Sequence, residues 1–282
     1  MATFYNQATL SYRGGVTNSN VTEGELIEAL GATKTAISAT YTAGGTVAYA
    51  ISIINSGAAA VTGASITDDL GGYAFGAGTV YPLDYIDGTI RMFVNGAAVT
   101  PPEVTAGPPL TVSGINIPAG ANALILYEAA VNGFAPLAPG STITNTATVT
   151  GGCSGTETVS ATVSVANTVS LTIAKAASTD TVECGDPLTY TFIIQNTGNT
   201  AVVATDDVIV TDTFNPALSD ITVTLNGAEL GAGAYTYDEA TGEFATNPGT
   251  ITVPAATYTT DAETGAIITT PGVAVLTVTG TV

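Results

Sequence analysis

The sequence of 282 residues contains no histidine, no tryptophan, two cysteines, and four basic residues against twenty-three acidic ones. Without histidine the chain lacks the commonest general acid–base residue and metal ligand. The formal net charge of −19 repels phosphate backbones and anionic lipids, so we expect neither nucleic acid nor a membrane as a partner. Nucleotide-binding glycine motifs and complete calcium loops are also missing. We predict no enzymatic activity, no small-molecule substrate, no cofactor and no metal site.

Long hydrophobic runs are missing as well. The apolar stretches are interrupted by Gly, Thr and Pro, so we expect no segment that crosses a bilayer. The first residues, MATFYNQATL, contain neither the basic stretch nor the apolar run of a secretory signal. We expect that such a signal was removed or was never present.

Alternation of apolar and polar residues dominates the chain instead. Thr, Val, Ala, Ile and Tyr recur with a period of two, as in TVAYAISII and VAVLTVTGTV, and turns rich in Gly, Pro and Asp separate these runs. The segment TEGELIEAL comes nearest to a helical pattern, but its alternation also permits a strand. Short strands at this spacing are typical of β-sandwiches. We therefore predict an all-β protein with immunoglobulin-like sandwiches.

The chain repeats itself once. The stretch KTAISATYTAGGTVAYAISIINSG from Lys34 aligns with KAASTDTVECGDPLTYTFIIQNTG from Lys175, and SITDDL aligns with IVTDTF. The two lysines are 175 − 34 = 141 residues apart, which is half of 282. This predicts two tandem sandwiches, the first over residues 31–168 and the second over residues 169–282.

The two repeats end differently. The first continues with TITNTATVTGG and TETVSATVSVANTVSL, whereas the second stops at GVAVLTVTGTV and is expected to lack two strands. The N-terminal stretch FYNQATLSYRGG aligns with TITNTATVTGG, and SNVTEGELIEAL follows as a second strand. We predict that residues 1–30 form a hairpin that completes the second sandwich of another copy. The alternative is a monomer in which this segment folds back within its own chain.

One face of the first strand of this hairpin is mostly apolar. Such a strand needs a sheet, and an incomplete sandwich exposes backbone groups that need a partner strand. Donor-strand addition meets both needs, and each large apolar side chain that it buries contributes about 1.5–3 kcal/mol. Because head-to-tail donation does not close on two copies, it predicts a filament. The predicted donor face consists of Phe4, Asn6, Ala8, Leu10 and Tyr12.

The blocks YTFIIQNTGN, VTDTF and TITNTATV resemble the bacterial surface-protein repeat known as domain of unknown function eleven. The resemblance covers nearly the whole chain, twice. It implies an immunoglobulin-like sandwich, an extracellular setting and a stalk or scaffold role. In some related surface domains it also implies a self-formed isopeptide bond between a lysine and an asparagine. Long surface proteins carry many such repeats and a wall anchor, whereas two repeats without an anchor favour a small self-assembling subunit.

Two sets of residues each contain the lysine, aspartate and asparagine that an isopeptide bond needs. The alternation of their strands directs these side chains toward the cores. A buried lysine loses its charge more easily and can attack an amide carbon while a protonated aspartate hydrogen-bonds the oxygen. The other interpretation is a buried, hydrogen-bonded Lys–Asp pair with Asn at a strand edge. Asn55 and Asn196 are rival acceptors. The first candidate set is Lys34, Asp68 and Asn145 within one chain. The second is Lys175 and Asp212 of one chain with Asn6 donated by a neighbouring copy.

The two cysteines lie in predicted turns. Cys153 lies in the turn between the last two strands of the first repeat, and Cys184 lies in the turn after the first strand of the second repeat. If the copies line up, these thiols meet at the junction between neighbours and can form a disulfide in an oxidising compartment. The alternative is that both thiols are free or paired within one chain.

Two classes of function remain after these exclusions. The first is a structural subunit that polymerises with copies of itself into an extracellular filament at a cell or spore surface. The second is a monomeric cell-surface adhesin or stalk module that binds an extracellular ligand. A strongly acidic surface keeps a fibre soluble. Removal of the N-terminal hairpin distinguishes these two functions. A filament subunit should lose assembly, whereas a monomeric adhesin should keep binding its ligand.

Overall fold

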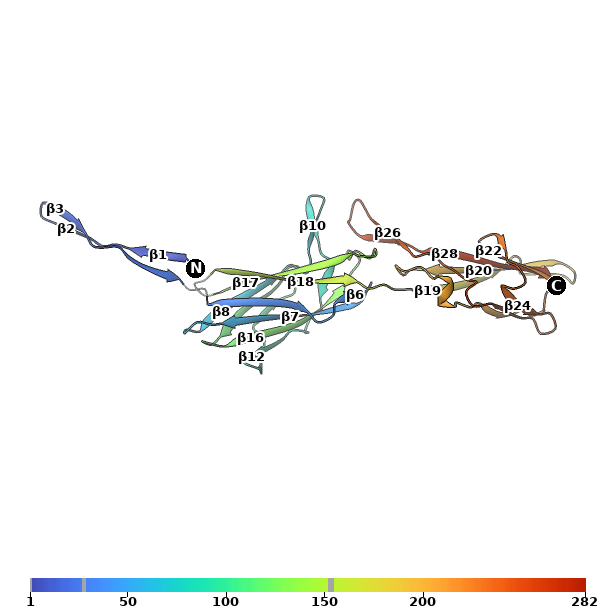
Figure 1. Cartoon of the computed structure of the whole chain (residues 1–282), viewed down its shortest axis with the longest axis horizontal. Coiled ribbons are helices and arrows are strands. Elements are labelled where there is room, and N and C mark those ends of the chain that lie inside the picture. The colour runs from blue at the N-terminus through green and yellow to red at the C-terminus, as the bar shows by residue number, and fades with distance from the viewer. Residues whose placement is uncertain (1, 27–28, 152–154) are drawn as a thin grey trace. The chain divides into compact units, whose positions relative to one another are not determined.

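The computed structural model describes residues 2–26, 29–151 and 155–282. Besides one 3-10 turn, Ala204–Asp206, every regular element within these ranges is a β-strand (Figure 1). The predicted all-β fold with two sandwiches is confirmed. The segment TEGELIEAL, which permitted a strand or a helix, contains a strand over Thr22–Leu26.

The chain divides into two compact units. Unit 1 comprises Met1–Ala135 and Thr142–Ser164, and unit 2 comprises Pro136–Ser141 and Val165–Val282. We call strands β5–β18 the first sandwich, strands β19–β28 the second sandwich, and strands β1–β4 the N-terminal hairpin.

The first sandwich has two main sheets. One has the strand order β13-β12-β16-β7-β5, with β11 beside β16, and the other has the order β14-β15-β8-β17-β18-β6. A separate hairpin of β9 and β10 completes the unit. The strands of the first sheet are β5 (Leu30–Ala36), β7 (Thr46–Asn55), β11 (Leu83–Tyr85), β12 (Arg91–Val94), β13 (Ala97–Val99) and β16 (Asn122–Val131). The others are β6 (Thr40–Tyr41), β8 (Val61–Asp68), β9 (Tyr73–Phe75), β10 (Gly78–Val80), β14 (Glu103–Thr105), β15 (Leu110–Ile117), β17 (Thr142–Thr150) and β18 (Thr156–Val165).

The second sandwich repeats one of these sheets except for β11 and the other only in part. Its first sheet has the order β23-β22-β28-β20-β19, which matches β13-β12-β16-β7-β5 strand for strand. Its second sheet has three strands in the order β21-β25-β24. The strands are β19 (Leu171–Ala177), β20 (Pro187–Asn196), β21 (Thr211–Thr213), β22 (Ser219–Leu225), β23 (Ala228–Glu229), β24 (Tyr235–Asp238), β25 (Glu243–Thr246), β26 (Thr257–Thr260), β27 (Ile267–Thr270) and β28 (Gly272–Thr281).

Alternation builds both cores, because successive side chains of a strand point to opposite faces. Strand β7 buries every second residue from Val47 to Asn55, and β16 buries the alternate residues from Ala123 to Val131. In the second sandwich, β28 follows the same rule from Gly272 to Gly280. The two faces that meet in each sandwich are therefore those on which Val, Ile, Leu and Tyr recur.

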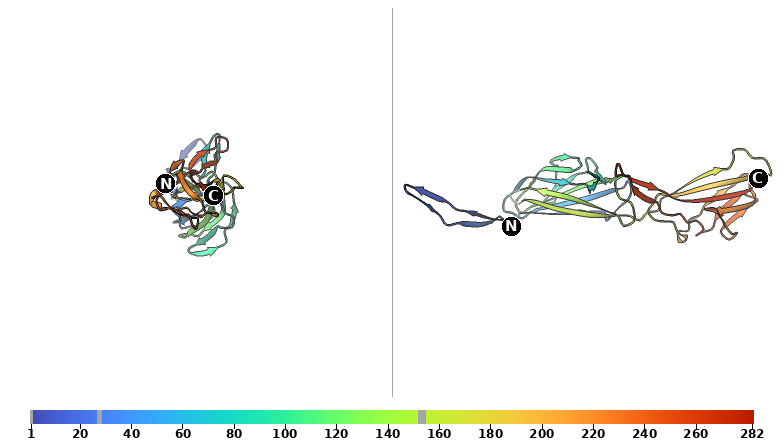
Figure 2. Two further views of the ribbon diagram at one scale, coloured as in Figure 1. Left: turned by 90° about the vertical axis from the view of Figure 1, so that its right-hand side faces the viewer. Right: turned by 90° about the horizontal axis from the view of Figure 1, so that it is seen from above.

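The N-terminal hairpin is a two-stranded ribbon, drawn in blue in Figures 1 and 2. Within the described residues, its strands pair only with one another, β1 with β4 and β2 with β3. The ladder is interrupted between these pairs, where the Gln7 side chain donates to the carbonyl of Ser19. The sequence predicted one continuous strand on each side, whereas the structure divides each into two. The strands are β1 (Ala2–Asn6), β2 (Thr9–Tyr12), β3 (Gly15–Asn18) and β4 (Thr22–Leu26).

Candidate functional site

A polar cluster lies in the core of the first sandwich, between its two main sheets. Lys34 on β5 donates from Nζ to Oδ2 of Asp68 on β8 at 2.7 Å. The hydroxyl of Tyr127 on β16 donates to the same oxygen at 2.6 Å, and it accepts from Nδ2 of Asn145 on β17 at 2.9 Å. The structure thus brings together the three residues that the sequence analysis selected in the first repeat, and it adds Tyr127.

Burial dominates the electrostatics of this cluster. The side chains of Lys34 and Asp68 are 0% and 1% exposed. Burial lowers the pKa of Lys34, although the neighbouring Asp68 carboxyl acts in the opposite direction. The Lys34 amine also lies 5.0 Å from the ring centroid of Tyr49, a stabilising position for a cation. The cluster therefore contains an amine that gives up its proton more readily than an exposed lysine does.

The hydrogen bonding of this cluster is incomplete. Within the described residues, Oδ1 of Asn145 and the hydroxyl of Tyr49 are buried without a hydrogen-bond partner. Burial raises the pKa of Tyr49. Unpaired buried polar atoms are costly, and they often mark a site with a further role. The Asn145 amide is therefore held on its nitrogen side and left open on its oxygen side.

The rival asparagines have a different role. Nδ2 of Asn55 donates to the carbonyls of Ala59, Ile117 and Pro118, and its Oδ1 accepts from the amide of Gly57. Asn196, the equivalent residue of the second sandwich, is bonded in the same manner to backbone groups. Both amides tie loops to the ends of strands. Their hydrogen-bonding capacity is taken up by the backbone, unlike that of Asn145.

The second sandwich contains the same lysine and aspartate in a more exposed setting. Lys175 on β19 forms an ion pair with Asp212 on β21, and its amine lies 4.3 Å from the ring centroid of Tyr190. The side chains of Lys175 and Asp212 are 39% and 18% exposed. Asn6, the third predicted member, lies on β1 of the hairpin, and the described chain does not bring it to this pair.

An open sheet edge explains this exposure. In the first sandwich β8 pairs with β15 on one side and with β17 on the other. In the second sandwich β21 pairs with β25, and no described strand takes the place of β17 or β18. Thr181 and Val182, which correspond to β6, are not in a strand. The sheet therefore stops three strands short of its counterpart.

Apolar surface accompanies the open edge. A groove of about 160 Å³ is bounded by the edge strand β19 on one side and by residues 208–210 on the other. Leu171 and Ile173 are 37% and 57% exposed, whereas Leu30, which corresponds to Leu171, is 8% exposed. Exposed apolar surface beside an unpaired edge is the surface that strand addition covers. The lining residues are Leu171, Thr172, Ile173, Ile194, Val208, Ile209 and Val210.

The N-terminal hairpin has the same strand register as β17 and β18. Asn6 lies opposite Thr22, and Asn145 lies opposite Ala161, so both strands correspond at a shift of 145 − 6 = 161 − 22 = 139 residues. The pairs from Thr3 with Glu25 to Asn6 with Thr22 all obey this shift. Beyond Gln7 the register changes by one residue.

The donor face predicted from the sequence is exposed on this hairpin. Phe4 and Leu10 are 57% and 64% exposed, whereas Ile143 and Val149, their counterparts on β17, are 2% and 1% exposed. The Phe4 ring lies across Gly24, where an added Cβ would come within 2.5 Å of it. The same face is thus apolar in both hairpins and is buried in only one of them.

Of the two cysteines, Cys184 is exposed. Cys153 lies outside the described residues, so the predicted disulfide between Cys153 and Cys184 stays a prediction. The described residues contain no group of three potential metal ligands. They also contain no helix with the length and apolar character to span a membrane.

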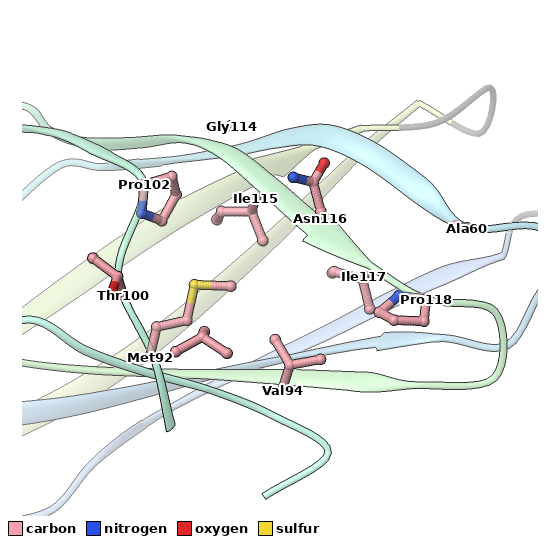
Figure 3. A pocket seen from close by; sticks show the side chains of 11 residues that line it. Ala60, Met92, Val94, Thr100, Pro102, Gly114, Ile115, Asn116, Ile117 and Pro118 are labelled. Carbon is pink, nitrogen blue, oxygen red and sulfur yellow. The ribbon is translucent and has the colours of Figure 1, made fainter. Parts of the chain in front are cut away.

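A larger groove of about 440 Å³ lies in the first sandwich (Figure 3). Its walls are mostly apolar, with Met92 and Val94 on one side and Ile115 and Ile117 on the other. The Asn116 side chain at its rim accepts a hydrogen bond from the amide of Gly63. The groove contains no titratable side chain, so it offers no chemistry comparable to that of the polar cluster.

Sequence reasoning did not select the two tyrosines of the cluster. Tyr49 and Tyr127 lie opposite each other on β7 and β16, and their rings stack with centroids 5.5 Å apart. A signal was available, because both occupy core-facing positions of strongly alternating strands, where a hydroxyl needs a polar partner.

No family model matches the chain, and no curated protein matches it either. The resemblance to the bacterial surface-protein repeat therefore stays a prediction.

Several solved structures resemble the chain weakly. The pilus backbone protein RrgB of Streptococcus pneumoniae is 13% identical, with a TM-score of 0.36, and the match covers 86% of this chain and 55% of that one. The major pilin BcpA of Bacillus cereus is 13% identical, with a TM-score of 0.36 and coverages of 95% and 73%. A fragment of the major pilin GBS80 of Streptococcus agalactiae is 13% identical, with a TM-score of 0.36 and coverages of 87% and 91%. The chain spans about half of the RrgB structure, and likenesses this weak do not bear on its function.

Proposed function

We propose that the chain is a structural subunit of an extracellular filament, in which the N-terminal hairpin of one copy completes the second sandwich of the next. The observation that carries the proposal is the shared register of two hairpins. Four successive pairs of β1 with β4 repeat the pairing of β17 with β18 at a constant shift of 139 residues. Over these four pairs, the hairpin thus matches the two strands that the second sandwich lacks within its described residues.

The register defines how the hairpin docks. In the first sandwich Ala147 lies opposite Asp68, and Val149 lies opposite Ile66. The same pairing places Ala8 of the donor opposite Asp212 and Leu10 opposite Val210. Leu10 then covers the apolar groove, and the donor backbone satisfies the free edge of β21, as in other cases of strand addition. The second donor strand lies next to Thr181 and Val182, as β18 lies next to β6.

Short connections favour docking onto another copy. Three residues, 27–29, separate β4 from β5, and five residues, 166–170, separate β18 from β19. A donated hairpin therefore joins two copies through a link like the one that joins the two sandwiches of one chain. Docking onto the chain's own second sandwich is the alternative, and the experiments below distinguish it. Because each copy offers one hairpin and one open edge, donation between copies propagates.

Covalent reinforcement is the second part of the proposal. Lys34 and Asn145 form an amide bond within each chain, beside Asp68, and Lys175 forms the equivalent bond with Asn6 of the neighbouring copy, beside Asp212. The buried contacts of the first cluster and the equivalent ion pair of the second support this assignment. Docking places Asn6 where Asn145 lies in the first sandwich. The first bond then stiffens the subunit, and the second joins subunits.

Assembly of two chains tests the polymer. The full chain and a chain without residues 2–26 are compared by electron microscopy and sedimentation, with thermal unfolding of the first sandwich as the control for folding. We expect filaments from the full chain and monomers from the shortened one. An excess of a synthetic peptide of residues 2–26 should shorten the filaments by occupying the open edges. Filaments from the shortened chain, or a full chain that stays monomeric and binds a surface ligand, would refute the proposal.

A further inference from the structure

The Tyr127 side chain links the Asp68 carboxyl to the Asn145 amide in the first cluster. Its hydroxyl is hydrogen-bonded to two groups of the proposed reaction, Oδ2 of Asp68 at 2.6 Å and Nδ2 of Asn145 at 2.9 Å. Lys34 Nζ lies 2.7 Å from the same Asp68 oxygen. A continuous path for a proton therefore leads from the amine through the carboxyl and the hydroxyl to the amide nitrogen.

The second sandwich lacks this hydroxyl. Tyr127 lies opposite Tyr49 in the pairing of β16 with β7, and the equivalent pair of β28 with β20 is Val278 with Tyr190. Val278 is fully buried. Phe214 stacks on Tyr190 there, with ring centroids 4.9 Å apart. The two sites thus share lysine, aspartate and one tyrosine, and only the first has a hydroxyl between the carboxyl and an asparagine.

We propose that Tyr127 is a catalytic residue of the Lys34–Asn145 bond, and that it passes a proton from Asp68 to the departing amide nitrogen. This inference rests on the proposed bond within the first sandwich. It assigns a role to a residue that a simple buried ion pair does not require. It also predicts that the two sites of one chain react by different proton paths.

The proposed step balances in atoms and protons. The Lys34 ammonium gives one proton to Asp68, and the neutral amine attacks Cγ of Asn145, which forms the new C–N bond. As the bond between Cγ and Nδ2 breaks, Tyr127 gives its hydroxyl proton to Nδ2, which leaves as ammonia. Asp68 returns its proton to Tyr127 and takes the second proton from the Lys34 nitrogen. One amide replaces another, one ammonia is lost, and Asp68 ends protonated.

The environment suits each part of this path. Burial lowers the pKa of Lys34, which favours the neutral amine. Burial and the neighbouring Asp68 carboxyl raise the pKa of Tyr127, so its hydroxyl stays protonated and gives up its proton only as Asp68 supplies another. General acid–base catalysis of this kind contributes about 10²–10⁴-fold to a rate. We expect the loss of the hydroxyl to slow bond formation by at least about 100-fold.

The four basic residues make the bond easy to detect with trypsin. Cleavage follows Arg13, Lys34, Arg91 and Lys175, and an acylated lysine is not cleaved. The proposed bond therefore joins peptide 14–91 to a peptide that begins at residue 92. The full chain is made by cell-free synthesis, samples are denatured at intervals, and the joined peptide, lighter by one ammonia, is measured by mass spectrometry.

Tyr127→Phe is the test variant, and Tyr49→Phe is its matched control, because the Tyr49 hydroxyl has no hydrogen-bond partner in the described residues. We expect the joined peptide to form at least about 100-fold more slowly in Tyr127→Phe and at nearly the normal rate in Tyr49→Phe. Equal rates in Tyr127→Phe and the unchanged chain would overturn the role of Tyr127 and leave the bond intact. Absence of the joined peptide from the unchanged chain would overturn the bond and the role together.

A second measurement separates catalysis from packing. Asn145→Ala prevents the bond, so the effect of Tyr127→Phe on the unfolding of that chain reports only the structural contribution of the hydroxyl. We expect the first sandwich to remain folded in both chains, because the phenylalanine ring keeps its stacking on Tyr49. A Tyr127→Phe chain that unfolds in the Asn145→Ala background would assign the slow reaction to lost structure and would contradict the proposal.

Discussion

The two sandwiches of this chain place the same lysine and aspartate in opposite environments. Lys34 and Asp68 are enclosed between two complete sheets, whereas Lys175 and Asp212 lie at an edge where no described strand covers them. The local sequence is not the cause, because β5 and β19 carry their lysines at equivalent positions opposite β7 and β20. The difference comes from β17 and β18, which cover the Lys34–Asp68 pair in the first sandwich. The described part of the second sandwich has no strands in their place.

The largest effect that we predict from this comparison is a loss of assembly caused by a substitution in the N-terminal hairpin. Leu10→Asp should abolish assembly, because its counterpart Val149 is buried and a lone buried charge costs several kcal/mol. Ser11→Asp is the matched control, since its counterpart Thr150 is exposed. Sedimentation of both chains provides the measurement. Assembly of the Leu10→Asp chain would show that this face does not dock.

Removal of each lysine gives the next largest effect. In an Asn145→Ala chain, which cannot form the bond, Lys34→Met leaves Asp68 buried without its partner and should lower the free energy of unfolding of the first sandwich by about 3–5 kcal/mol. Lys175→Met removes an exposed pair and should cost the second sandwich of a hairpin-deleted monomer less than about 1 kcal/mol. Urea unfolding of both chains tests the contrast, and equal losses would contradict it.

One apolar position sharpens the comparison further. Ile143→Ala removes a buried side chain and should cost about 2–4 kcal/mol in the unfolding of the first sandwich. Phe4→Ala, at the equivalent position of the hairpin, should leave the unfolding of an unassembled chain unchanged. It should instead weaken assembly, which concentration-dependent light scattering measures. A stability loss from Phe4→Ala in the monomer would indicate docking within the same chain.

The smallest predicted effect is a pH dependence. In an Asn145→Ala chain, Lys34 keeps its amine, and its pKa is lower in the folded state than in the unfolded state. The unfolded state therefore binds more protons between the two pKa values, and the free energy of unfolding rises with pH toward 10.5. The slope is at most about 1.4 kcal/mol per pH unit. Lys34→Met in the same background should remove it, and a slope that persists would assign it to other groups.

Much of the fold could be predicted from the sequence. Alternation identified the strands, and the internal repeat identified two sandwiches, because a strand period and a repeat length are properties of neighbouring residues. The pairing of Lys34 with Asp68 followed from the faces of their strands. Tyr127 was missed because its strand pattern marks it only as a core residue, and the distances from its hydroxyl to Asp68 and Asn145 depend on how the two sheets pack.

The hairpin shows a second limit of sequence reasoning. The sequence aligns Asn6 with Asn145, and the structure extends that match to the second strand through Thr22. The interruption at Gln7 was not predicted, because it depends on a side-chain hydrogen bond to Ser19. The destination of the hairpin is also not encoded in its own pattern, since any open edge of matching shape accepts a strand.

The most direct test of donation between copies is a disulfide at the predicted register. One chain carries Leu10→Cys and a second carries Val210→Cys, both with Cys153→Ser and Cys184→Ser, and the two are mixed and oxidised. We predict a disulfide-linked pair of chains, because these positions face each other as Val149 and Ile66 do in the first sandwich. Thr211→Cys, on the opposite face of β21 from Asp212, should link poorly. If the mixture gives no linked pair, and one chain with both substitutions forms its disulfide internally as a monomer, the hairpin belongs to its own chain and the account is wrong.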